Sequence, residues 1–90
     1  MDRETVEVHE RAIAAHHGCT AWYASKTVPV QVEVDGVHHE KLVHIYQLLH
    51  HPRATRCFVF DHGPGVATIL DEPPTDSPER AVIGAIKGSA

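Results

Sequence analysis

Five histidines lie within sixteen residues, in the stretch VHHEKLVHIYQLLHHP that runs from Val37 to Pro52. Imidazole binds transition metals and exchanges protons near neutral pH, so the stretch suggests a metal site, a catalytic patch or an exposed titratable surface. No two histidines stand two, three or four positions apart, the spacings that place two ligands on one face of a strand or helix. Three pairs are adjacent instead: His16-His17, His38-His39 and His50-His51. Because adjacent strand residues point to opposite faces, the spacing favours an exposed histidine surface.

A metal site formed by long-range pairing is the alternative. If Ile45 pairs with Phe58 in an antiparallel hairpin, His39 comes to lie diagonally opposite His62. The ligands would then be His39, His62 and Asp61, and the metal zinc or nickel, because imidazole suits both. Asp61 is expected on the opposite face of its strand from His62, which weakens this site.

The two cysteines, Cys19 and Cys57, are too few for a disulfide scaffold of this size. We therefore expect reduced thiols and a cytoplasmic protein. Cys57 follows Arg56, but the two side chains should point to opposite faces of a strand, so the guanidinium does not activate the thiol. A buried Cys57 that packs like a small apolar residue is the preferred interpretation, and no catalytic residue is predicted.

Length and charge exclude several classes of protein. Ninety residues with 42% hydrophobic content predict a single domain spanning residues 1–90. The net charge of −4 argues against partners such as nucleic acid or an anionic membrane surface. No apolar run is long enough to span a membrane, and the charged N-terminus is not a secretory signal. Protonation of all nine histidines would change the net charge from −4 to +5. This change would be centred at about pH 6.

Helices are predicted at both ends of the chain. Residues Asp2 to His17 contain good helix formers, and Gly18 is a natural stop. Near the other end, Ser77 is a suitable N-cap and Pro78 fits the first helical position. The apolar face of this second helix comprises Val82, Ile83 and Ile86, and Gly88 ends it.

Strands are predicted in between. VPVQVEV alternates valine with polar residues, and Asp35-Gly36 fits a two-residue hairpin turn. The stretch from near Val37 to the expected connection LHHPRA fits both a helical and a strand pattern, and we choose the strand because the turn needs a partner strand. TRCFVFDH and VATIL, separated by GPG, complete the sheet. The fold class is therefore α+β: an antiparallel four- to five-stranded sheet with an N-terminal helix and a short C-terminal helix packed on it.

The stretch VHIYQLLHHPRATRCFVFDH, followed by DEPPTDSPERAV, resembles small uncharacterised bacterial proteins. These have a strand, a His-Pro-basic turn, a second strand and a helix that starts at Pro-Asp-Ser-Pro, in that order. The resemblance covers about half of the chain. It implies a sheet followed by a helix, and it implies no activity and no site residue.

The preferred functional hypothesis is a small non-enzymatic binding or protein-interaction module that acts as a homo-oligomer or within a complex. It rests on the small size of the chain and on sheet edges that need protection or pairing. Aromatic residues and a loop tip supply the expected contacts for a protein partner or for self-association: Trp22, Tyr23, Tyr46, His50, His51, Arg53 and Arg56. Zinc or nickel binding is the second hypothesis, and a small cysteine or histidine enzyme is the third.

Overall fold

Six elements follow one another in the computed structural model, which describes residues 1–73 and 75–88. They are α1 (Arg3–His17), β1 (Thr20–Val34), β2 (Val37–Leu49), β3 (Arg56–His62), β4 (Gly65–Leu70) and α2 (Pro78–Gly88). The strands form one antiparallel sheet in the order β1-β2-β3-β4. The predicted α+β class, with a helix at each end of the chain and a four-stranded sheet between them, is confirmed.

α2 begins after the predicted cap Ser77, whereas α1 begins one residue later than predicted, with Asp2 as its cap. The Asp2 side chain accepts a 2.7 Å hydrogen bond from the Thr5 N–H at the start of α1. Gly18 ends α1 with φ 67°, a left-handed conformation that costs glycine little. At the start of α2, the Ser77 hydroxyl accepts a 3.3 Å hydrogen bond from the Arg80 N–H.

The hairpin between β1 and β2 has the predicted turn, because Asp35 and Gly36 both have positive φ, 51° and 78°. Residues 37–49 are a strand, as predicted. The residue pair that closes such a turn is hydrogen-bonded, and hydrogen-bonded and non-hydrogen-bonded pairs then alternate along the two strands. Pro29, which pairs with Leu42, therefore occupies a non-hydrogen-bonded position. Its missing N–H therefore removes no ladder bond, which suits proline on an edge strand.

Strand β1 is longer than its alternating valines indicate, since it runs back to Thr20. The register shifts between Tyr23 and Lys26, and Ser25 has φ 57°. This β-bulge inserts two residues and restores the original alternation after it, so Trp22 and Lys26 lie on the same face.

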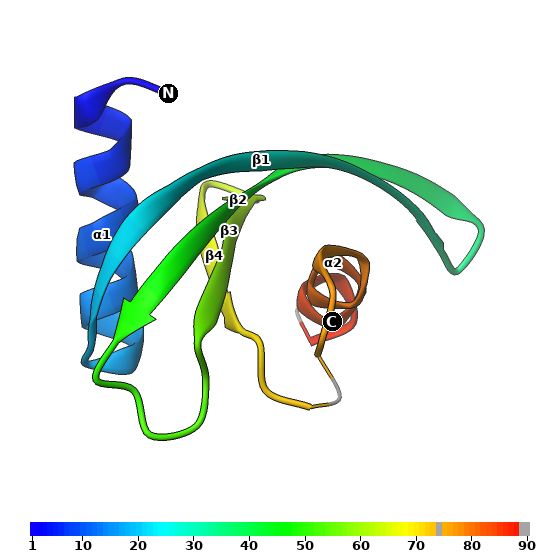
Figure 1. Cartoon of the computed structure of the whole chain (residues 1–90). Helices are drawn as coiled ribbons and strands as arrows, with labels where there is room; N and C mark the ends of the chain where they lie inside the picture. The colour runs from blue at the N-terminus through cyan, green and yellow to red at the C-terminus, as the bar shows by residue number, and fades with distance from the viewer. Residues whose placement is uncertain (74, 89–90) are drawn as a thin grey trace.

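The two helices lie on opposite faces of the sheet, as Figure 1 shows. The core under α1 includes Ile13, Tyr46 and Cys57, whereas Val82 of α2 packs with Phe58 on the other side. β3 is therefore buried on both faces. The hairpin of β1 and β2 extends past β3 and arches over α2 (Figure 1).

Candidate interaction surface

The face of the sheet that holds α2 is covered over only part of its length. α2 packs against the part that contains Ile45 and Phe58. Gln47 and Leu49 lie further along the same face of β2, because residues two apart on a strand share a face. Trp22 pairs with Gln47 and Thr20 pairs with Leu49, so Trp22 and Leu49 are diagonal neighbours.

These two apolar residues are unusually accessible for their size, since Trp22 is 48% exposed and Leu49 is 40% exposed. The row that starts at Trp22 continues across the sheet through Gln47 to Arg56. Asp71 ends the row, because its N–H donates to the Arg56 carbonyl at 3.1 Å. We call Trp22, Gln47, Leu49 and Arg56 the open sheet surface.

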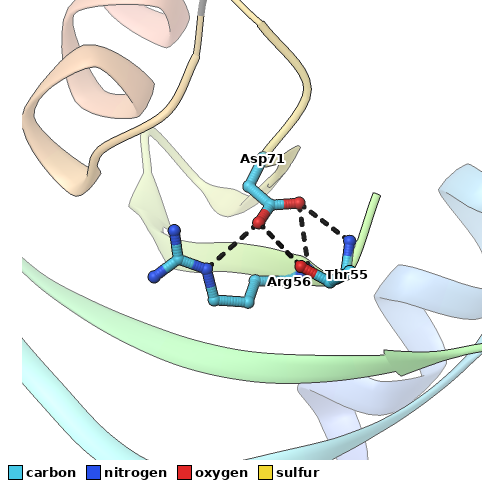
Figure 2. A network of polar contacts seen from close by, with 3 residues as sticks. All are labelled: Thr55, Arg56 and Asp71. Atoms are coloured by element: carbon cyan, nitrogen blue, oxygen red, sulfur yellow. Dashed lines mark hydrogen bonds and ion pairs between the residues drawn. The ribbon is translucent and has the colours of Figure 1, made fainter. Parts of the chain in front are cut away.

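Asp71 holds the polar end of this row in place, as Figure 2 shows. Its carboxylate accepts hydrogen bonds from the Arg56 N–H and from the Arg56 guanidinium, both at 3.0 Å. It also accepts from the Thr55 N–H at 3.0 Å and from the Thr55 hydroxyl at 3.2 Å. Burial raises the pKa of Asp71, but these hydrogen bonds outweigh burial and leave the pKa below its usual value.

The loop after β2 is shaped by its own histidine. His51 Nδ1 accepts hydrogen bonds from the Ala54 N–H at 2.9 Å and from the Arg53 N–H at 3.2 Å. The imidazole therefore closes the turn. His50 and Arg53 are exposed, and Arg53 pairs with Glu72 at 3.4 Å. His50 directly follows Leu49 in the chain, so this loop begins at the open sheet surface.

The predicted partner contacts are divided between the two faces of the sheet. Trp22 and Arg56 lie on the same face, within the open sheet surface, and the loop residues follow β2 directly. Tyr46 is fully buried, so it has no surface to offer a partner. Tyr23 pairs with Tyr46 on the opposite face, and their ring centroids are 5.4 Å apart. The adjacency of Trp22 and Tyr23 in sequence conceals this separation.

The residues of the alternative metal site lie in different parts of the sheet. The expected pairing of Ile45 with Phe58 is present, but the ladder between β2 and β3 ends at His44 and Val59. His39 pairs with Val32 in the arching hairpin. Within residues 1–73 and 75–88, no group of three or more His, Cys, Asp or Glu side chains is arranged to hold a metal ion.

Both cysteines are free thiols. Cys57 is fully buried, and burial is the main cause that raises its pKa to about 12, with smaller contributions from Cys19 and Asp71. A thiol with this pKa is almost entirely protonated at neutral pH and is a poor nucleophile. This geometry does not favour a reactive Cys57.

The structure also brings together a polar cluster that sequence spacing did not reveal. The rings of His9 and His44 are stacked, and the His9 Nδ1 lies 3.0 Å from the Tyr46 hydroxyl. His9 and Tyr46 are 37 positions apart, so their proximity depends on how α1 docks on the sheet. The only available sequence signal was a histidine on the same helical face as Ile13, four positions away.

A second histidine contact joins the end of α1 to β4. His16 Nδ1 lies 2.6 Å from the Thr68 hydroxyl, and His17 Nε2 lies 2.9 Å from both the hydroxyl and the carbonyl oxygen of Thr68. The backbone of Asp71 is hydrogen-bonded to Arg56 of β3, and successive residues of β4 alternate between bonding to β3 and pointing away from it. The Thr68 carbonyl therefore points away from β3, at the free edge of the sheet. His17 therefore covers part of the exposed edge of β4.

Comparison of the chain with models of known protein families, with curated proteins and with solved structures finds no match. The resemblance to small bacterial proteins in the second half of the chain gains no support from them. Among the described residues, no helix is long and apolar enough to cross a membrane.

Proposed function

We propose that this chain is a protein-interaction module that self-associates through the open sheet surface. The observation that carries the proposal is the pair Trp22 and Leu49, which are diagonal neighbours and are 48% and 40% exposed. Large apolar side chains gathered at one exposed place are typical of a protein contact. Tryptophan and arginine are also the residues that most often dominate binding energy in such contacts.

The neutral border of the open sheet surface is compatible with a second copy of the chain as the partner. Two ion pairs, Arg53 with Glu72 and Arg56 with Asp71, border the apolar centre. Because each arginine is paired with a carboxylate of its own copy, the border carries no net charge, and two copies would not repel each other across an isologous interface. A chain of this length also has a small core, so association adds to its stability.

The energetic scale is sufficient for a measurable effect. Full burial of a large apolar side chain contributes about 1.5–3 kcal/mol. Trp22 and Leu49 are already partly buried, so each would contribute about half of that in each copy. Truncation of either residue should therefore weaken a dimer about tenfold or more, since about 1.4 kcal/mol corresponds to a factor of ten.

Sedimentation equilibrium of matched variants tests this proposal. Trp22→Thr and Leu49→Thr keep a side chain that suits a strand and remove the apolar contact. We expect both to raise the dimer dissociation constant by about tenfold or more. Leu42→Thr is the matched control, because Leu42 is 60% exposed but lies on the opposite face of the hairpin from Trp22. Equal dissociation constants for all three variants and the parent chain would contradict the proposal.

A further inference from the structure

His9 and His44 form a stacked pair at the contact between α1 and the sheet. Their ring centroids are 5.2 Å apart and the planes meet at 29°. His9 is only 4% exposed, on the buried face of α1, and His44 comes from the middle of β2. The helix thus docks on the sheet through an imidazole that rests against a second imidazole.

Each ring is held by a hydroxyl. His9 Nδ1 lies 3.0 Å from the Tyr46 hydroxyl, and His44 Nδ1 lies 2.9 Å from the Thr27 hydroxyl. The Tyr23 hydroxyl lies 2.7 Å from the same Thr27 oxygen. A hydroxyl accommodates a neutral imidazole in either tautomer and provides no countercharge for an imidazolium. In the described part of the chain, no carboxylate is hydrogen-bonded to either ring.

We propose that the His9–His44 pair is a proton-operated latch, in which uptake of protons by the pair releases α1 from the sheet. Two imidazolium rings in this stack would repel each other, because one ring is buried and the other is half-buried. Separation of α1 from β2 relieves the repulsion and hydrates both rings. The apolar surface that α1 covers, which includes Tyr46 and Cys57, would then become accessible.

The groups around the pair, taken together, lower the pKa of both histidines in the docked state. Burial lowers the pKa of His9, and the nearby His44 lowers it further, while Asp61 of β3 acts in the opposite sense. Burial likewise lowers the pKa of His44, which Asp61 raises and the N-terminal amino group lowers. The rings of Tyr46 of β2 and Tyr23 of β1 also lie against the pair, and Glu10 of α1 acts electrostatically on Tyr46.

The sign of the pH dependence follows from these shifts. Both histidines have a lower pKa in the docked state than in the released state, so the released state binds more protons. Docking of α1 is fully supported above about pH 6.5, the ordinary histidine value, and weakens as the pH falls through the lower values of the docked state. The two rings titrate as a coupled pair.

Amide hydrogen exchange between pH 7.5 and pH 5 tests the latch, with α2 as an internal reference. After correction for intrinsic exchange rates, we expect the protection of α1 amides to fall about tenfold or more. The protection of α2 amides should change much less, because no histidine of the pair faces α2. Loss of protection in α1 and α2 to the same extent would mean global unfolding and would overturn the proposal.

Variants separate the pair from the other histidines. The double variant His9→Gln/His44→Gln keeps hydrogen-bonding side chains and cannot take up protons, so α1 protection should become independent of pH. If the double variant does not fold, His44→Gln alone should reduce the fall in protection. His38→Gln, on the same strand, should behave as the parent chain. A fall that persists in the double variant, or that disappears in His16→Gln/His17→Gln, would refute the latch.

Discussion

Asp71 and Arg56 face each other at the ends of β4 and β3, where the Asp71 carboxylate accepts hydrogen bonds from both the backbone and the side chain of Arg56 at 3.0 Å. The carboxylate thereby extends the hydrogen bonding between β3 and β4 past Cys57 and Leu70, the last residues that pair in the sheet. It also positions the Arg56 guanidinium, which lies 5.3 Å from the centre of the Phe58 ring. The charged border of the open sheet surface is thus part of the folded framework.

Asp71→Ala should therefore destabilise the fold. The substitution leaves the N–H groups of Thr55 and Arg56 without their acceptor, and we expect a loss of about 2–3 kcal/mol in urea unfolding at pH 7. Because the pKa of Asp71 is lowered on folding, its contribution is present above about pH 4 and is lost as the pH falls through the lowered value. The parent chain and the variant should then converge in stability at low pH.

Asp76→Ala is the matched control, since Asp76 forms only an exposed pair with Arg80 at 3.5 Å. Exposed pairs of this kind contribute less than about 1 kcal/mol. Equal losses in the two variants would show that the Asp71 network does not have the role assigned to it.

Tyr46→Phe should also destabilise the fold, because it removes the hydroxyl that faces His9 Nδ1 in a buried site. We expect a cost of about 1–2 kcal/mol in urea unfolding at pH 7.5. Tyr23→Phe is the control, since the Tyr23 hydroxyl contacts Thr27 at an exposed position and its loss should cost less. A Tyr46→Phe chain as stable as the parent would argue against a structural role for the His9–Tyr46 contact.

Cys57 should be unreactive in the native protein. Its pKa is raised to about 12 and its side chain is buried, so a disulfide reagent at pH 7.5 should modify Cys19 and leave Cys57 intact. Mass spectrometry of the labelled chain, with and without denaturant, distinguishes the two thiols. Rapid native labelling of Cys57 would revive the hypothesis of a cysteine enzyme.

Zinc and nickel should bind weakly, at several equivalents and without one preferred site. This follows because no cluster of potential ligands is found in the described residues and the exposed histidines are spread over the surface. Amide NMR titration of the tag-free chain at pH 7 measures this directly. Shifts that saturate at one equivalent around His39 and His62, and disappear in His39→Gln/His62→Gln, would instead establish the zinc or nickel site.

The elements of the fold were predictable where local chemistry specifies them. Asp2 and Ser77 mark helix starts, and Asp35-Gly36 specifies a turn that in turn requires residues 37–49 to be a strand. The bulge in β1 has no such signal, since Ser25 adopts its positive φ without being glycine. The register of β1 against β2 between Thr20 and Tyr23 could therefore not be predicted from the sequence alone.

The site depended on distant contacts and was less predictable. Trp22 and the loop residues were anticipated as exposed contacts, whereas Tyr46 was wrongly placed with them because its burial depends on α1. Asp71 and Arg56 are 15 positions apart, and the sequence around Asp71 reads only as the end of a strand. The stacked pair joins His9 and His44, which are isolated in the sequence and belong to none of the adjacent histidine pairs.

The most direct test of self-association uses the fluorescence of Trp22, the only tryptophan of the chain. Its emission should shift to shorter wavelength, and iodide should quench it less, as the concentration rises from about 1 µM to about 1 mM. Leu49→Thr should move this transition to higher concentration, and Leu42→Thr should leave it unchanged. An emission spectrum that is independent of concentration over this range would contradict burial of the open sheet surface against a second copy.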